Sequence, residues 1–345
     1  MPITTVLGNV EKCGAGYILP HEHLLIDLRK LVDKPADESV AHFFESLGMS
    51  NRWRVYNDPY ALLDNAVIEE EDTALKELLL FKQAGGDTVA DVTLDDIGRN
   101  PSALARLSRA SGVNIVMGCG HYIAGAHPEK IKSLSEKELA AEMIADLTEG
   151  VNGTGIKAGV IGEIGTSASI SAEEYKVLKA AGIACLETGK SVHVHTSLYE
   201  RNGLLVARTL LEMGVRSDRI CIDHIDVQPA REYIPRLLDM GVYVEFDNFG
   251  KEFYVPHGNP GLLKDRFVYD LERAGLIASL AGKGYLKQIL ISNDICLKSM
   301  LCEYGGNGYG HIFRTVKNML CDCGLSPFQY ETIVKDNAAD FLCGE

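Results

Sequence analysis

Short apolar runs rich in β-branched residues alternate along the chain with longer segments in which apolar residues recur every three or four positions. The short runs have the length and composition of buried strands, and the longer segments have the period of amphipathic helices. There are eight such runs, at residues 18–25, 87–93, 114–119, 159–164, 191–197, 219–225, 242–248 and 288–293. Strands that alternate with helices form a parallel sheet, and eight repeats favour closure over an open sheet. We therefore expect an α/β fold of the TIM (β/α)8 barrel type.

Polar residues mark the boundaries of the expected helices. The stretches Ser135–Glu138 and Ser171–Glu174 have the capping-box pattern, and they precede helical segments that run to Glu149 and Glu187. Glycines mark the returns to the following strands, at Gly150, Gly189, Gly214 and Gly241. The sequence contains no internal repeat, low-complexity stretch or linker, so we expect one barrel domain over residues 1–345.

Two connections are longer than an ordinary turn between a strand and a helix. They cover residues 26–66 after the first strand and residues 249–262 after the seventh. Loops that follow the strands of a barrel lie on the face where the chemistry happens. We therefore expect a distorted barrel whose substrate pocket is shaped by these two loops.

Composition and charge narrow the possible partners. The 345 residues are 46% hydrophobic, and 34 Lys and Arg against 48 Asp and Glu give a net charge of −14. A field of that sign repels polyanions, which argues against nucleic acid and anionic membranes and favours a small-molecule substrate. The nine cysteines have no disulfide framework of spacings, and neither a signal peptide nor a membrane-spanning run is apparent. These features predict a cytoplasmic location.

Candidate metal ligands gather at the ends of the expected strands. His21 and His23 are two positions apart on the first expected strand, so both rings lie on the same face. The other candidates end strands four, five, six and eight, and they are Glu163, His195, His224 and Asp294. Four histidines and two carboxylates are the ligand set of a hydrolytic centre with two divalent ions.

This ligand set indicates hydrolysis without selecting the bond. Two cations lower the pKa of a bridging water towards neutrality and so produce a bridging hydroxide nucleophile. Asp294 is placed to take the proton from the attacking hydroxide and deliver it to the leaving group. Polarisation by a metal ion suits a carbonyl or a phosphoryl centre equally.

The motifs that carry these residues resemble the phosphotriesterase-like family of the amidohydrolase superfamily. The likeness runs essentially from end to end of the chain, through Pro20–Leu24, Gly162–Ser167, His195–Ser197, and Asp294 followed by Gly305–Tyr309. The resemblance implies a TIM-type barrel that holds two divalent ions, zinc in the first place, with manganese, cobalt or iron as alternatives. It also implies a homodimer.

The resemblance further implies which residues hold each ion. His21, His23 and Asp294 would hold the buried ion, and His195 and His224 would hold the more exposed one. A bridging carboxylate and the bridging hydroxide would join the two ions.

The bridging position departs from the best-studied members of the family, which use a carbamylated lysine. Here the strand carries Glu163 and no lysine, and the nearest lysine, Lys157, precedes it. The chain is similar to the glutamate-bridged branch, that of the phosphotriesterase-homology and phosphotriesterase-related proteins. A permanent carboxylate needs no carbon dioxide to form the site, and phosphotriesterase activity is not implied.

The resemblance and the basic residues of the active-face loops together suggest a substrate. Lactonases, including some that act on phosphorylated sugar lactones, occur among the relatives, which favours a carboxylic ester or lactone with an anionic group. Candidate contacts to that group are Arg201, Lys251 and Lys298. The main alternative is an amidase acting on an N-acyl amino acid-like substrate. A phosphotriesterase and a non-catalytic binding protein that keeps the barrel are the remaining alternatives.

Three further polar residues lie near the expected site. Tyr122 follows strand three, and the resemblance suggests that it donates a hydrogen bond to the substrate or the hydroxide; packing as a core aromatic is the alternative. Asp226, two residues after His224, could relay protons, orient that histidine or be a simple loop carboxylate. His193 shares a strand face with His195, one layer deeper, with or without contact to the site.

Overall fold

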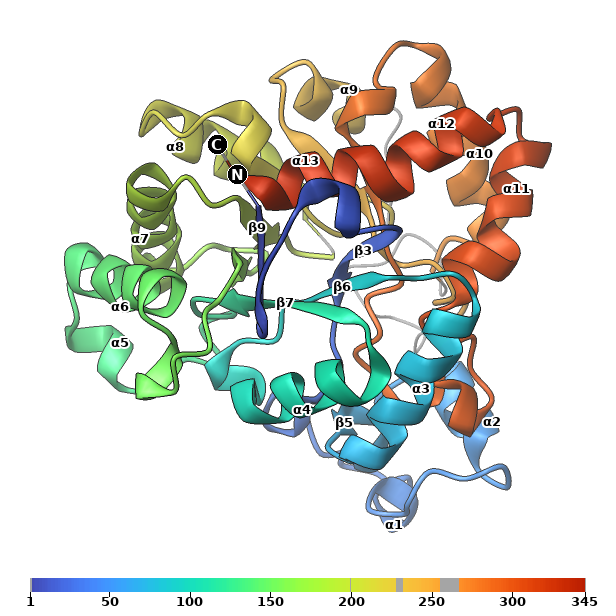
Figure 1. Cartoon of the computed structure of the whole chain (residues 1–345). Helices are drawn as coiled ribbons and strands as arrows, with labels where there is room; N and C mark the ends of the chain where they lie inside the picture. Colours follow the sequence, from blue (N-terminus) through green and yellow to red (C-terminus); the bar gives the residue numbers. More distant parts are fainter. Residues whose placement is uncertain (1, 199, 228–231, 255–266, 345) are drawn as a thin grey trace.

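Eight parallel strands form one sheet that curves almost into a closed barrel (Figure 1). The computed structural model describes residues 2–198, 200–227, 232–254 and 267–344. Around the barrel the strands are β3 (Ile18–Glu22), β6 (Thr88–Asp91), β7 (Asn114–Cys119), β8 (Val160–Gly165), β9 (Val192–His195), β10 (Ile220–Ile222), β11 (Tyr243–Phe246) and β12 (Ile289–Ile291). Each neighbouring pair from β3 to β12 is parallel. The eight expected strands and the barrel fold are therefore confirmed.

Side chains join the first strand of the barrel to the last. The backbone amide of His21 donates to Ser292 Oγ over 3.0 Å. The backbone amides of Asn293 and Ile295 donate to Glu22 Oε1 and Oε2 over 2.8 and 2.9 Å. Burial raises the pKa of Glu22 to about 7, although these hydrogen bonds act in the opposite direction. Between β3 and β12, the carboxyl group of Glu22 thus provides hydrogen bonds in place of part of the backbone ladder that pairs neighbouring strands.

Helices surround the strands in the order expected for a barrel (Figure 1). They are α3 (Glu71–Gln83), α4 (Pro101–Ser111), α5 (Lys130–Ser133), α6 (Glu136–Thr148), α7 (Ala172–Thr188), α8 (Gly203–Glu212), α9 (Tyr233–Leu238), α10 (Asp270–Gly282), α11 (Lys317–Asp322), α12 (Pro327–Glu331) and α13 (Ala338–Cys343). Ser135 and Ser171 form the two expected capping boxes. Helix α7 is capped by Gly189, whose φ of 70° is in the left-handed region that favours glycine.

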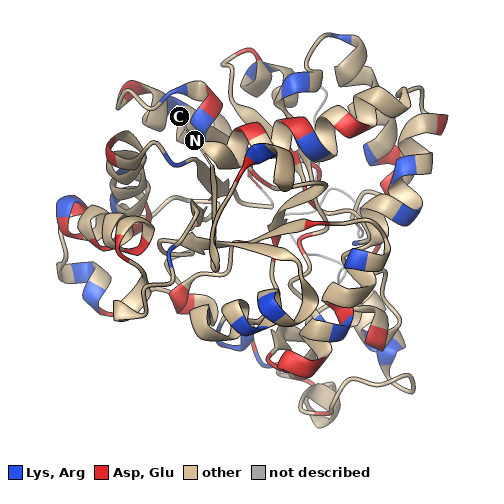
Figure 2. Cartoon of the chain, in the orientation of Figure 1, with Lys and Arg blue, Asp and Glu red and all other residues tan. Residues whose placement is uncertain are grey.

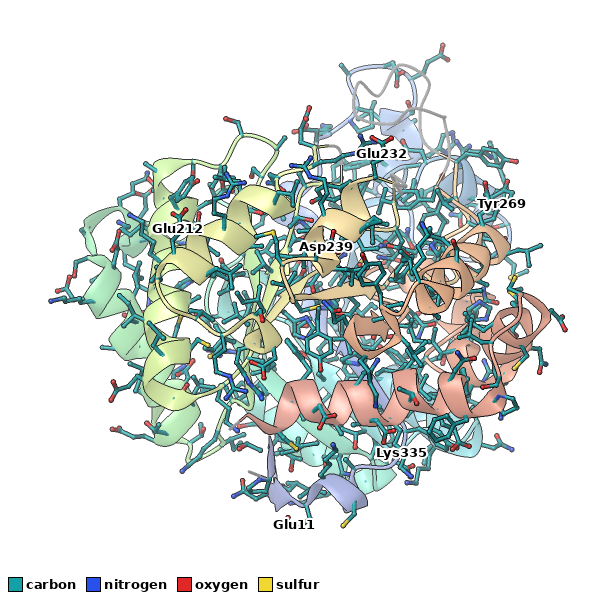
Figure 3. All side chains as sticks on the ribbon, turned by 90° about the horizontal axis from the view of Figure 1, so that it is seen from above. Glu11, Glu212, Glu232, Asp239, Tyr269 and Lys335 are labelled. Carbon is teal, nitrogen blue, oxygen red and sulfur yellow. The ribbon has the colours of Figure 1, made fainter. Side chains whose placement is uncertain are left out.

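The end of the barrel where the strands begin is closed by the two ends of the described chain. The hairpin of β1 (Ile3–Thr5) and β2 (Gly8–Val10) lies beside α13, and the termini are adjacent (Figure 1). The ring of Phe341 in α13 packs against Tyr243 at the start of β11, with 5.3 Å between ring centroids. Side chains fill the interior of the ribbon (Figure 3), so the barrel is a packed core and not a pore.

The long connection after the first strand has structure of its own. It contains β4 (Ile26–Asp27), which pairs with β5 (Val67–Ile68), and two short helices, α1 (Val40–Phe43) and α2 (Arg52–Asn57). The connection after β11 was expected to be long as well, but residues 255–266 lie outside the described residues.

The outer helices carry both signs of charge (Figure 2). Within the described part of the chain, no helix combines the length and the apolar character needed to cross a membrane.

Candidate metal centre

The six candidate ligands converge at the end of the barrel where the strands finish. They come from β3, β8 and β9, and from the residues just after β3, β10 and β12. Their side chains are buried apart from the partly exposed His195. They form two clusters that share the carboxylate of Glu163.

The inner cluster contains the histidine pair of the first strand. Nε2 of His23 lies 3.2 Å from Glu163 Oε1 and 3.1 Å from Asp294 Oδ1. Nε2 of His21 lies 3.6 Å from Glu163 Oε2 and 3.8 Å from Asp294 Oδ1. Two imidazoles and two carboxylates therefore face one point.

The outer cluster lies on the other side of Glu163. Oε2 of this residue is 3.0 Å from His195 Nδ1 and 3.3 Å from His224 Nε2. The two imidazole nitrogens are 2.7 Å apart. One glutamate thus faces both clusters, as the sequence predicts for a bridging carboxylate.

These residues fit a pair of divalent ions. Bonds of about 2.0–2.2 Å to a tetrahedral ion place its ligand atoms about 3.3–3.6 Å apart. The separations given above run from 2.7 to 3.8 Å and so bracket that spacing. Both ring nitrogens of His21 are buried and make no hydrogen bond within the part of the chain that the structure describes. Imidazole and carboxylate donors suit zinc, manganese, cobalt and iron.

Charge inside the centre is carried by imidazoles and carboxylates together. Burial alone would raise the pKa of Glu163, but His21, His195, His224 and His23 hold it well below the usual range. Burial lowers the pKa of His23, but Asp294 and Glu163 raise it to about 9. Without a metal ion, protons on the imidazoles supply the positive charge that the buried carboxylates require.

Backbone geometry directs two of the ligands. His224 and Asp294 have φ values of 59° and 47°, in the left-handed region that residues other than glycine rarely adopt. Each such residue costs about 1–3 kcal/mol and is found mainly at functional sites. His224 lies two residues after the end of β10 and Asp294 lies three residues after the end of β12, and the turn at each position directs the side chain into the centre instead of along the strand.

Further residues orient the ligand histidines. Asp247 Oδ1 lies 2.9 Å from His224 Nδ1, and Asp247 Oδ2 accepts from the backbone amide of His224 over 2.9 Å. Thr93 Oγ1 lies 2.9 Å from His23 Nδ1. Such contacts fix the tautomer of a ligand histidine. The sequence pattern did not single out Asp247, although this residue directly follows β11 and so has the strand-end position that the candidate ligands share.

Asp226 lies further from the centre than these residues. It accepts hydrogen bonds from Asn248 Nδ2 over 2.7 Å and from Arg273 Nε over 2.8 Å. Among the described residues, hydrogen bonds connect it to His224 through Asn248 and Asp247. Its proposed role as a proton relay stays a prediction.

A cavity of about 260 Å³ opens onto the metal-centre residues. Its lining includes His23, Glu163, His195, His224 and Asp294 from the centre, and apolar residues from several loops, namely Ile26, Leu28, Leu198, Phe253, Phe267 and Leu297. The connection after β3 also contributes Asp58, Pro59 and Tyr60. The hydroxyl of Tyr122 lines the cavity 3.1 Å from His195 Nδ1, within reach of a bound molecule.

Lys251 is the only lysine or arginine among the described residues that line this cavity. Its ammonium group forms a buried ion pair with Asp294 Oδ2. Burial lowers the pKa of Lys251, but Asp294 raises it above its ordinary value. In return, Lys251 and the nearby imidazoles hold the pKa of Asp294 below its usual range despite burial.

The other two candidate cations lie outside the described lining. Arg201 is exposed after β9. Lys298 pairs with Asp64 in the connection after the first strand, with 2.5 Å between Nζ and Oδ1. Of the three candidates, the structure therefore brings only Lys251 to the cavity.

Comparison with known proteins finds relatives over nearly the whole chain. The model of the phosphotriesterase family matches residues 1–342. N-acetyltaurine hydrolase of Danio rerio is 31% identical over 345 residues, which cover 99% of this chain and 97% of the relative.

Two crystal structures are similar over nearly the whole chain. A resiniferatoxin-binding protein from Rhodobacter sphaeroides has a TM-score of 0.95 and 32% identity, with 100% of this chain and 96% of that chain covered. The phosphotriesterase homology protein from Escherichia coli, with phosphate in its active site, has a TM-score of 0.78 and 28% identity, with 95% and 99% covered. The chain therefore belongs to the phosphotriesterase family and is a hydrolase.

Proposed function

We propose that the protein hydrolyses the amide bond of a small N-acyl compound whose amine part carries an acidic group, such as an N-acyl amino acid or amino sulfonate. The observation that carries this proposal is Lys251, the one lysine or arginine among the described residues of a mostly apolar cavity, placed directly against Asp294. An acidic substrate group needs such a partner, and the apolar wall suits a short acyl chain. The N-acetyltaurine hydrolases, similar over 97% of their length, support the amide bond.

Two divalent ions are part of this proposal. His21, His23, Glu163 and Asp294 would hold one ion, and His195 and His224 would hold the other with Glu163 between them. When bound, such ions polarise the scissile carbonyl and lower the pKa of a water molecule between them. Zinc is the first candidate because of the imidazole donors.

Side chains of the chain itself would then move the proton and hold the substrate. Asp294 takes one proton from the attacking water and delivers it to the amine nitrogen as the bond between carbon and nitrogen breaks. Lys251 keeps Asp294 ionised and faces the acidic group of the substrate. The Tyr122 hydroxyl lies 3.1 Å from His195 Nδ1. When this nitrogen binds the metal ion it no longer accepts a hydrogen bond, so the hydroxyl would donate to the carbonyl oxygen of the substrate instead.

The ester or lactone bond favoured by the sequence uses the same residues and stays a prediction. It differs from the amide in the leaving group, because an alkoxide leaves more readily than an amide nitrogen. Both bond types therefore belong in one assay.

The test is hydrolysis by the full chain after loading with Zn²⁺, Mn²⁺ or Co²⁺. N-acetyltaurine would be compared with N-ethylacetamide, which lacks the sulfonate, and with the acetate ester of 2-hydroxyethanesulfonate, which replaces the amide N–H by oxygen. A charge-assisted contact is worth about ten- to a hundredfold in kcat/KM, so the charged amide should exceed the neutral amide by that factor. Lactones with and without phosphate complete the set. Turnover of lactones or esters with no turnover of any amide would contradict the amide proposal.

A further inference from the structure

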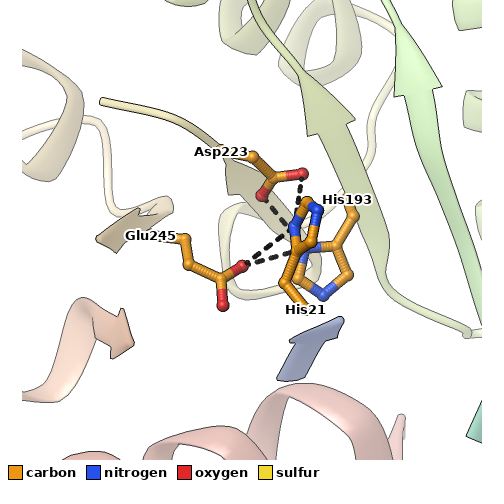
Figure 4. A group of neighbouring side chains, drawn as sticks. All are labelled: His21, His193, Asp223 and Glu245. Atoms are coloured by element: carbon orange, nitrogen blue, oxygen red, sulfur yellow. Dashed lines mark hydrogen bonds and ion pairs between the residues drawn. The ribbon is translucent and has the colours of Figure 1, made fainter. Parts of the chain in front are cut away.

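A second group of buried titratable side chains lies deeper in the barrel than the metal centre. It consists of His193 in β9, Asp223 after β10, Glu245 in β11 and the Nδ1 side of His21 (Figure 4). All four side chains have no exposed surface. We call these four residues the inner group.

Distances within the inner group suit a shared central ion better than a set of hydrogen bonds. His21 Nδ1 lies 3.5 Å from Asp223 Oδ2 and 3.6 Å from Glu245 Oε2. His193 Nδ1 lies 3.0 Å from Asp223 Oδ1 and 3.3 Å from Glu245 Oε2. Hydrogen bonds between nitrogen and oxygen are usually about 2.7–3.2 Å long. Three of the four separations exceed that range, and they lie near the edge of about 3.3–3.6 Å expected for a tetrahedral ion with bonds of about 2.0–2.2 Å.

Four polar atoms of the inner group make no hydrogen bond within the described part of the chain. Within the described residues, no hydrogen bond is made by His21 Nδ1, Asp223 Oδ2, Glu245 Oε1 or His193 Nε2. The ion pairs recorded for Asp223 and Glu245 involve imidazoles alone. Buried carboxylates are normally paired with a cation or bound to a metal ion. The inner group therefore has two buried carboxyl groups and, within the described residues, no lysine or arginine paired with either.

We infer that the inner group binds a third divalent cation in a tetrahedral site made of two imidazoles and two carboxylate oxygens. His21 contributes Nδ1 to this site, and its Nε2 faces the metal centre described above. On loading of the inner group, His21 would release its Nδ1 proton to solvent, and Nε2 would remain directed at the metal centre. Two nitrogen and two oxygen donors suit zinc best, followed by manganese or iron.

The surroundings predict that this ion exchanges slowly. The His193 ring packs against Phe341 of α13, with 4.7 Å between centroids, at the closed end of the barrel. The metal-centre residues lie between the inner group and the cavity, since Glu163, His195 and Asp294 line the cavity and the inner group does not. A chelator in solution reaches the metal centre first.

Metal content before and after native dialysis against EDTA tests the inference on the full chain, with no substrate involved. After expression with added zinc, the wild type should hold about three ions per chain and keep one after dialysis. Glu245→Gln and His193→Gln should lose the resistant ion and keep the exchangeable ones. Glu163→Gln should show the opposite pattern, because it lies in the exchangeable centre.

A matched control is His311→Gln, which removes another buried histidine with a carboxylate partner, Asp270, 2.6 Å away. This variant should keep the wild-type metal content. Circular dichroism would confirm that each variant is folded. A wild type with no chelator-resistant ion would overturn the inference by itself, whatever the variants do. Equal metal content in the wild type and in folded Glu245→Gln and His193→Gln would also overturn it. Because the readout is metal content, failure here is distinguishable from failure of the proposed amide hydrolysis.

Discussion

The ammonium group of Lys251 forms an ion pair with Oδ2 of Asp294, while Oδ1 of the same carboxylate faces His23. One carboxylate therefore lies between the metal centre and the single described lysine of the cavity. This arrangement connects the three roles that we propose for the site, namely ion binding, proton transfer and recognition of an acidic substrate.

Lys251→Met removes the cation and keeps most of the side-chain volume. A contact made equally in the ground and transition states acts mainly on KM. We expect KM for an acidic amide to rise about ten- to a hundredfold, with little change for its neutral analogue. Steady-state kinetics with both substrates measure this. Lys298→Met is the matched control, because it removes a lysine that pairs with Asp64 outside the described lining. Equal effects of the two substitutions would contradict the assignment.

The same variant should change the pH dependence. Burial raises the pKa of Asp294, but Lys251 and the imidazoles more than offset this and keep the carboxylate ionised at low pH. Activity that needs the ionised form is present above the pKa and lost as the pH falls through it. Removing Lys251 raises that pKa, so the acidic limb of the kcat profile should move to higher pH. An acidic limb at the wild-type position would show that Lys251 does not control Asp294.

Glu163→Gln tests the shared carboxylate of the centre. The substitution keeps the shape and removes the negative charge that faces both clusters. We expect the loss of at least one exchangeable ion and of nearly all turnover, measured by elemental analysis and by kinetics. Glu138→Gln, in the exposed capping box of α6, is the control. Retention of both exchangeable ions at normal rates would mean that another group bridges.

Asp294→Asn tests the proton transfer. The amide is nearly isosteric but cannot accept a proton, and general acid–base groups contribute about 10²- to 10⁴-fold. We expect kcat to fall by at least about a hundredfold while some metal remains bound. A variant that keeps more than about a tenth of the activity would rule out this role.

Asp226→Asn separates a structural role from a relay. Asp226 and Arg273 form a fully buried pair at 2.8 Å, and breaking such a pair costs about 3–5 kcal/mol. We expect the free energy of unfolding to fall by about that amount, with kcat changed by less than a proton-transfer group would give. Chemical denaturation and kinetics on the same preparation measure both. Loss of kcat with unchanged stability would instead support the relay.

Much of the barrel could be predicted because its signals are local. The apolar runs mark the strands, and places at strand ends point to the six candidate ligands, His21, His23, Glu163, His195, His224 and Asp294. The inner group was only partly visible. The spacing of His193 and His195 showed a shared face, but a contact between His193 and Glu245 depends on how neighbouring strands are staggered around the barrel.

The basic residues of the loops show the limit of sequence reasoning more clearly. Arg201, Lys251 and Lys298 look equivalent along the chain, because each follows a strand. They differ because of contacts between segments that are far apart in the sequence. Lys298 pairs with Asp64, 234 residues earlier in the chain, whereas Lys251 lines the cavity.

The contacts of Glu22 indicate when the metal centre forms during folding. It lies between His21 and His23, and its carboxylate accepts the backbone amides of Asn293 and Ile295, which flank Asp294. The earliest and the latest ligands in the sequence are therefore held in place by one residue. A folding intermediate in which β12 has not yet docked beside β3 also lacks the cluster in which His21 and His23 face Glu163 and Asp294. Ion uptake should consequently be a late event, and the time course of metal binding during refolding would report the closure of the barrel.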